Sequence, residues 1–101
     1  MSRGRARTTA RADFDIKRIA LWIASQSSVD AALRWSVDLD EKFESLARTP
    51  GSGTDRGTLG RGLRSSPFGR YLIFFRAERR GGIVITRVIH GAQDYGRFFK
   101  R

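Results

Sequence analysis

Apolar residues recur at helical spacing across the stretch Ala10–Ser25. They form one stripe with Trp22 at its border, made of Phe14, Ile16, Ile19, Ala20 and Ile23. The charged positions that lie mostly off this stripe are Arg11, Asp15 and Arg18. This spacing predicts an amphipathic helix, and Thr9 stands where its N-cap is expected.

A second helix is predicted over Val29–Arg48. Its apolar face recurs at intervals of four and three residues through Ala32, Ser36, Leu39, Phe43 and Leu46. Ser27, with Asp30 three residues later, resembles a capping box at its start. The segment Thr49–Gly51, which contains a proline, ends it. The short link between the two helices indicates an antiparallel hairpin.

The second half of the chain alternates apolar runs with turn residues. Strands are expected at Leu63–Ser66, Arg70–Glu78 and Ile83–His90, with turns at Ser66–Gly69 and Arg79–Gly82. The stretch Gly51–Gly62 before them predicts a loop of about a dozen residues, long enough to have a function of its own.

The run Tyr71–Phe75 is continuously apolar, which predicts a central strand covered on both faces. The helix hairpin can cover one face. For the other face two interpretations stay open: the tail with Phe98 and Phe99 folds back over it, or a separate chain docks there. At the other end of the sequence, Arg5–Thr9 is interpreted as an edge strand or, alternatively, as part of a disordered arm.

Length and composition limit the class of protein. The 101 residues suffice for one domain with a modest core, and no apolar run is long enough to span a membrane. The basic N-terminus has no apolar stretch behind it, so we expect no secretory signal and a cytoplasmic location. Without cysteine there is no disulfide or Cys-based metal site, and with one His we expect no zinc site and no cofactor.

The net charge of +10 is concentrated in the second half of the chain. Residues 1–50 carry a balance of +2 and residues 51–101 a balance of +8. We therefore expect an acidic or nucleic-acid partner to meet the predicted sheet. A GC-rich genome would also favour arginine over lysine, but it would not explain this asymmetry.

Four motifs follow one another in a recognisable order. They are the helical pattern Ala12, Asp15-Ile16, Ile19, Trp22-Ile23; the segment Leu59, Gly60, Gly62, Leu63, Arg64; the strand Tyr71-Leu72-Ile73-Phe74-Phe75-Arg76; and the ending Arg87-Val88-Ile89-His90-Gly91-Ala92-Gln93-Asp94. Together they resemble the RelE/ParE superfamily of bacterial toxins, and the ParE branch more closely. The departures are Ile16, Trp22 and Phe75, which are conservative, and Gln93, where an arginine is often found.

The resemblance covers about residues 5–95 and implies an α+β fold of order β-α-α-β-β-β, with a helix hairpin packed on a small, mainly antiparallel sheet. It implies a single toxin domain over 1–101, with an arm at 1–4 and a tail at 96–101. It further implies a cognate antitoxin that wraps an extended, helix-containing, acidic and amphipathic segment around the toxin. The candidate antitoxin-binding residues are Leu63, Tyr71, Ile73, Phe75, Arg76 and Arg87.

Relatives of the two branches differ in activity. RelE-type toxins cleave mRNA in the ribosomal A site, whereas ParE-type toxins poison DNA gyrase without a known reaction of their own. RNA cleavage would need cations and proton carriers, for which the candidates are Arg64, Arg87 and His90, with Arg76 as a further cation and Tyr71 and Tyr95 as further proton carriers.

Two features favour the gyrase poison. The three lysines lie off the predicted sheet, and Gln93 stands roughly where a RelE-like enzyme would place an essential arginine. His90 is interpreted as structural, holding the turn at the end of its strand. Three function classes remain: a gyrase inhibitor neutralised by an antitoxin, a ribosome-dependent mRNA endonuclease, and a degenerate toxin that only binds antitoxin. Topoisomerase IV stays open as another target.

Overall fold

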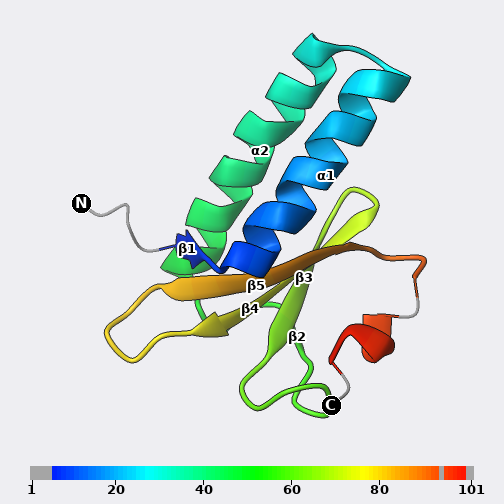
Figure 1. Cartoon of the computed structure of the whole chain (residues 1–101). Coiled ribbons are helices and arrows are strands. Elements are labelled where there is room, and N and C mark those ends of the chain that lie inside the picture. Colours follow the sequence, from blue (N-terminus) through cyan, green and yellow to red (C-terminus); the bar gives the residue numbers. More distant parts are fainter. Residues whose placement is uncertain (1–5, 94, 100–101) are drawn as a thin grey trace.

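The computed structural model describes residues 6–93 and 95–99, so the expected arm at 1–4, Arg5 and the last two residues of the tail lie outside the described residues. Two long antiparallel helices stand over a curved sheet (Figure 1). In chain order the elements are β1 (Ala6–Thr8), α1 (Ala10–Gln26), α2 (Val29–Arg48), β2 (Thr54–Asp55), β3 (Arg64–Phe68), β4 (Tyr71–Ala77), β5 (Ile83–His90) and the 3₁₀ helix η2 (Tyr95–Phe99). This confirms the expected α+β order.

The sheet has the strand order β1-β5-β4-β3-β2. β1 pairs with β5 in parallel, and the other neighbours are antiparallel. A β-bulge between Phe74 and Phe75 shifts the register between β4 and β5, and Thr86 on β5 is the extra residue. The predicted edge strand at the N-terminus is confirmed over Ala6–Thr8.

Both helices begin with side-chain caps. The Thr9 hydroxyl accepts a hydrogen bond from the Ala12 amide at 3.1 Å, as predicted. The predicted capping box at Ser27 is wrong, because Ser27 ends α1 and the next residue caps α2. The Ser28 hydroxyl accepts from the Ala31 amide at 3.0 Å. In the two-residue link, Ser27 is thus the C-cap of α1 and Ser28 is the N-cap of α2.

The predicted apolar face of α2 is confirmed, because Ala32, Leu39, Phe43 and Leu46 are buried. The face of α1 is rotated from the prediction. Phe14 is 53% exposed, whereas Asp15, expected mostly off the stripe, is only 6% exposed. The reason is that α1 lies along the edge of β5, where a carboxylate finds polar partners.

The β3 strand extends further than predicted, to Phe68, so the turn lies at Gly69-Arg70 rather than Ser66–Gly69. Gly69 adopts a positive φ of 57°, which a two-residue hairpin turn requires. Pro67 is tolerated inside β3 because β2 pairs only with Arg64 and Ser65 and leaves this part of the edge open. The two-residue β2 was predicted as loop.

The sheet carries an apolar core on each face. On the helix side the buried residues of both helices pack against Ile73, Phe75, Ile83, Ile85 and Val88. On the other side Leu63, Phe74 and Ile89 are covered by the protein's own chain, through Leu59, Leu72, Phe98 and Phe99. The ring of Phe99 lies 4.9 Å from that of Phe74. The interpretation that the tail covers this face is therefore confirmed, and a separate chain is not needed there.

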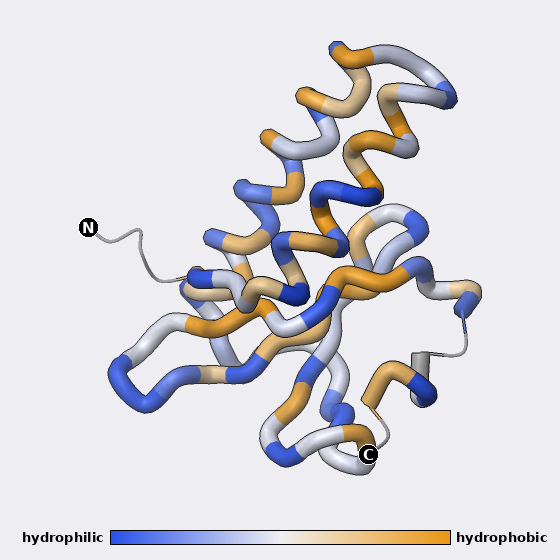
Figure 2. Tube along the Cα trace, in the orientation of Figure 1, coloured by the Kyte–Doolittle hydropathy of each residue, from blue (hydrophilic) through white to orange (hydrophobic). Residues whose placement is uncertain are grey.

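Hydropathy along the chain follows this arrangement (Figure 2). The central strands are apolar, while the β4–β5 turn is hydrophilic. Apolar segments also recur along the two helices on positions away from the sheet. Neither described helix combines the length and the apolar character that crossing a membrane requires.

Candidate functional site

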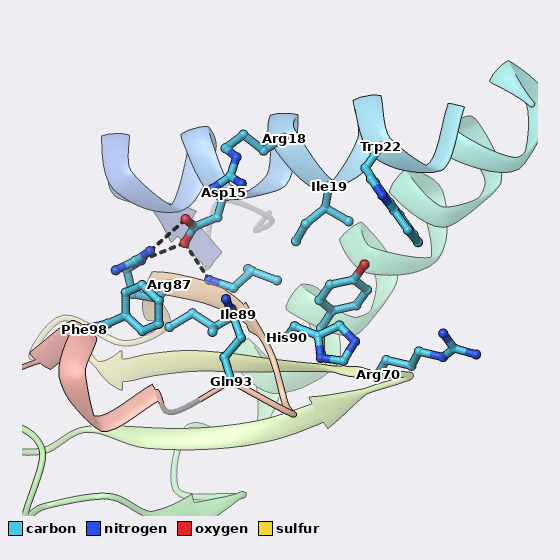
Figure 3. Close-up of a pocket in the computed structure, with 12 residues that line it drawn as sticks. Asp15, Arg18, Ile19, Trp22, Arg70, Arg87, Ile89, His90, Gln93 and Phe98 are labelled. Carbon is cyan, nitrogen blue, oxygen red and sulfur yellow. Dashed lines mark hydrogen bonds and ion pairs between the residues drawn. The ribbon is translucent and has the colours of Figure 1, made fainter. Parts of the chain in front are cut away.

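A pocket of about 560 Å³ lies between α1 and the C-terminal half of β5. Figure 3 shows that its side chains come from α1, from the β3–β4 turn, from the end of β5 and from the segment that follows. The residues that line it are Asp15, Arg18, Ile19, Trp22, Arg70, Tyr71, Arg87, Val88, Ile89, His90, Gln93 and Phe98. We call this pocket the groove. It combines apolar and aromatic surface with several cationic or hydrogen-bonding groups.

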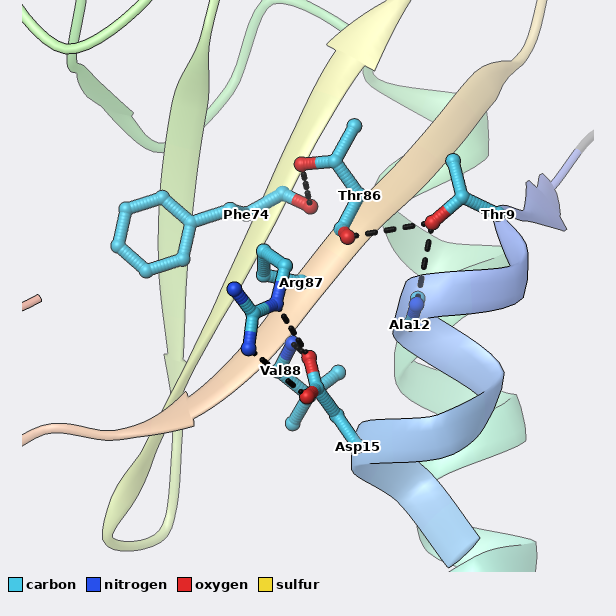
Figure 4. Close-up of polar contacts among 7 residues, drawn as sticks. All are labelled: Thr9, Ala12, Asp15, Phe74, Thr86, Arg87 and Val88. Carbon is cyan, nitrogen blue, oxygen red and sulfur yellow. Dashed lines mark hydrogen bonds and ion pairs between the residues drawn. The ribbon is translucent and has the colours of Figure 1, made fainter. Parts of the chain in front are cut away.

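The groove exists because β1 is shorter than β5. β1 pairs only with Ile83, Val84 and Ile85, and beyond them α1 takes over the edge of β5. The Thr9 amide donates to the Ile85 carbonyl at 3.0 Å, and the Thr9 hydroxyl donates to the Thr86 carbonyl at 3.2 Å. One threonine thus caps α1 and fastens it to the strand (Figure 4).

Asp15, six residues after Thr9 in the chain, continues this attachment further along α1. Its carboxylate accepts a hydrogen bond from the Val88 amide at 3.0 Å, a group that β1 no longer reaches. It also accepts two hydrogen bonds from the Arg87 guanidinium, at 2.8 and 3.0 Å. The side chains of Arg87 and Asp15 are 12% and 6% exposed, so this is a nearly buried, two-pronged ion pair.

Arg87 is fixed from a second direction as well. Its guanidinium lies 4.9 Å from the ring centroid of Phe98, a cation–π distance. Because one carboxylate already neutralises it, Arg87 adds little free positive charge to the groove. Arg18 and Arg70 are both exposed and lie on the rim of the groove.

His90 holds the turn that follows β5, as predicted. Its Nδ1 accepts a hydrogen bond from the Ala92 amide at 3.1 Å. A neutral imidazole in this arrangement carries its proton on Nε2, which remains a donor. The ring meets Tyr71 edge-on at 5.4 Å, and Tyr71 meets Trp35 of α2 at 5.9 Å. His90 is therefore the end of an aromatic row that joins the groove to the helices.

Among the predicted antitoxin-binding residues, three belong to the core. Leu63, Ile73 and Phe75 are at most 1% exposed, so they stabilise the fold and present no surface to a partner. Tyr71 and Arg87 line the groove. Arg76 lies elsewhere, and its guanidinium donates to the Arg61 carbonyl at 2.9 Å.

The candidate catalytic residues do not converge. Arg64 donates to the carbonyls of Ser52 and Gly53, at 2.6 and 3.1 Å, and so fastens the loop before β3. Arg64 pairs with Phe75, and His90 pairs with Tyr71, which lies four residues earlier on β4. At about 3.3 Å per residue this separates the two by roughly 13 Å along the sheet, and Arg87 between them is bound to Asp15.

Of the residues that line the groove, the sequence prediction named only Tyr71, Arg87 and His90 as site residues. The charged and aromatic residues on α1 and in the β3–β4 turn that it missed include Asp15, Arg18, Trp22 and Arg70. Asp15 and Trp22 already stood in the helical motif of the first part of the chain, and a carboxylate beside an apolar stripe is a signal of burial with a partner. Arg18 and Arg70 are ordinary exposed arginines in the sequence. Among the described residues no cluster of His, Asp or Glu has the arrangement to hold a metal ion.

Comparison with known proteins agrees with the fold. The family model described as ParE toxin of type II toxin-antitoxin system, parDE, matches residues 6–95. A solved chain from the chromosomal ParDE TA system from P. aeruginosa superposes with a TM-score of 0.71 at 21% identity, covering 84% of this chain and 92% of that chain. None of the curated proteins matches the sequence. Because the family model spans nearly the whole chain, the protein belongs to the ParE toxin family of type II toxin–antitoxin systems.

Proposed function

We propose that this chain is a toxin that inhibits DNA gyrase in the cytoplasm and is neutralised by a cognate antitoxin bound in the groove. The observation that carries the proposal is the family match over residues 6–95. The chemistry of the groove also supports the proposal, because apolar and aromatic residues line it and arginines lie on its rim. Most of the net positive charge is carried by residues 51–101, which contribute the sheet side of the groove.

The arrangement of polar groups supports an inhibitor rather than a nuclease. Cleavage of RNA would need a proton carrier beside cations that are free to stabilise a phosphate. Here Arg64 binds the loop before β3, Arg87 binds Asp15, and His90 holds a turn. Each candidate group has a structural partner, and Arg64 and His90 lie toward opposite ends of β4.

An acidic, amphipathic antitoxin segment fits the chemistry of the groove. Its apolar side chains would pack between Trp22 and Tyr71, and its carboxylates would meet Arg18 and Arg70 on the rim. Beyond the Val88 amide, which Asp15 binds, the end of β5 borders the groove and is not paired with β1, so an extended segment would also find backbone groups at a strand edge there.

The target is tested with two assays on the same purified chain. Gyrase supercoiling and gyrase–DNA cleavage complexes are measured against toxin concentration, beside cleavage of ribosome-bound mRNA. We expect supercoiling to fall, cleavage complexes to rise and mRNA to stay intact. Intact supercoiling at excess toxin together with cut mRNA would replace the proposal by the endonuclease. A chain that binds antitoxin but arrests neither growth nor gyrase would be a degenerate toxin.

A further inference from the structure

The helix hairpin carries an apolar surface that the groove does not use. Each large hydrophobic residue that is more than half exposed in the described chain lies on α1 or α2: Phe14, Leu21, Trp22, Val29, Leu33 and Val37. Trp22 lines the groove, and the other five define what we call the outer hairpin face. Val29, Leu33 and Val37 recur every four residues, which makes a continuous seam along α2.

The charges around this face differ in sign between the two helices. On α1 the exposed charged residues are Arg11, Asp13, Lys17 and Arg18, so that helix is mainly basic. On α2 they are Asp30, Arg34, Asp38, Asp40, Glu41, Glu44 and Arg48, so that helix is mainly acidic. An acidic partner would be attracted by one helix and repelled by the other. A surface with a basic and an acidic stripe is complementary to itself.

We propose that the outer hairpin face binds a second copy of this chain, with α1 of each copy lying against α2 of the other. A twofold axis parallel to the helices achieves this and places basic against acidic side chains on both sides. An axis across the helices would instead place α1 against α1 and α2 against α2, with like charges opposed. The product is a four-helix bundle with the two sheets on its outer sides.

The hairpin geometry gives the register of this contact. The helices leave the same two-residue link, so positions equally far from it lie at the same height. Leu21 is then level with the seam at Leu33 of the second copy. Lys17 lies two positions, about 3 Å, from the level of Asp40 of the second copy. The centre of the proposed interface is thus apolar, and the ion pair between Lys17 and Asp40 lies about one helical turn from it.

Analytical ultracentrifugation of the purified chain over a range of concentrations tests the proposal. We expect the mass to rise from 11.4 kDa toward twice that value, and Leu33→Gln to remain at the monomer mass. Leu33 is 59% exposed, so this variant keeps the fold, which circular dichroism verifies. The matched control Arg80→Glu, at the exposed β4–β5 turn, should associate like the parent chain.

A charge swap distinguishes the proposed pairing of Lys17 with Asp40 from non-specific hydrophobic association. Lys17→Glu and Asp40→Lys should each weaken association about tenfold, and the two changes in one chain should restore it, because the pair is re-formed with reversed signs. A parent chain that stays monomeric at all concentrations would overturn the proposal and leave the face to the antitoxin or to no partner. A dimer that tolerates Leu33→Gln, or is not restored by the swap, would also overturn it.

Discussion

Asp15 and Arg87 form a nearly buried ion pair across 72 positions of sequence, with the shorter contact at 2.8 Å. The same carboxylate binds the Val88 amide at 3.0 Å, so one side chain joins α1 to both the backbone and a side chain of β5. Removal of this carboxylate would leave a charge and a backbone donor unpaired in a site that water scarcely reaches.

Asp15→Ala is therefore expected to lower the free energy of unfolding by about 3 kcal/mol, the scale for breaking a buried pair from one side. Urea denaturation measures the loss. Glu41→Ala, which removes an exposed carboxylate from α2, is the control and should change stability by less than about 0.5 kcal/mol. A loss for Asp15→Ala as small as that of the control would show that the pair contributes little to the fold.

The sequence predicted the helices well because their patterns are local. The spacing of Leu39, Phe43 and Leu46 along α2 identifies the buried face without knowledge of any neighbour. The place of α1 against the sheet is not local. Whether Asp15 or Phe14 faces inward depends on where β1 stops, and that length is set by pairing with a strand about 77 residues later, as the register of Ala6 with Ile83 shows.

The same limit applies to the candidate site. The resemblance indicates Leu63, Ile73 and Phe75 as antitoxin-binding residues, but their side chains are buried, because the two aromatic residues of the tail cover one face of the sheet and the helices cover the other. The groove joins Trp22 of α1 to Arg70 of the β3–β4 turn. Nothing in the local pattern of either residue indicates the other.

The loop before β3 has a sharp requirement for glycine at one position. Gly53 has a φ of +83°, and a Cβ there would stand 2.4 Å from the Ser65 carbonyl oxygen. Gly53→Ala should therefore lower the free energy of unfolding by more than about 1 kcal/mol. Gly51→Ala is the matched control, because its Cβ would have no heavy atom within 4 Å. Equal stabilities of the two variants in urea denaturation would contradict this account.

The contact between Arg7 and Glu78 should respond to acid. The hydrogen bond from Arg7 holds the pKa of the Glu78 carboxyl below its ordinary value of 4.5. A carboxyl with a lowered pKa contributes stability above the ordinary value and loses it as the pH falls through the lowered one. The stability difference between the parent chain and Glu78→Gln should therefore favour the parent at neutral pH and shrink in acid.

Urea denaturation at a series of pH values measures that difference, with Glu41→Gln as a carboxyl control on α2. The effect is expected to be small and to weaken in high salt, because the Arg7 side chain is 64% exposed. A difference that stays constant from neutral pH to below 4.5 would mean that the ion pair does not stabilise β1 at the edge of the sheet.

Substitution of two arginines at hairpin turns tests whether the antitoxin binds in the groove. Arg70 lines the groove, whereas Arg80 lies in the β4–β5 turn and does not line it. Arg70→Glu and Arg80→Glu change the net charge equally, so any general attraction of an acidic antitoxin falls equally in both. We expect only Arg70→Glu to weaken antitoxin binding further, by about tenfold or 1.4 kcal/mol, measured by calorimetry at two salt concentrations. Equal affinities for the two variants would place the antitoxin outside the groove. Gyrase inhibition is measured for both variants as a control, and inhibition equal to that of the parent chain would show that neither change alters the toxin activity.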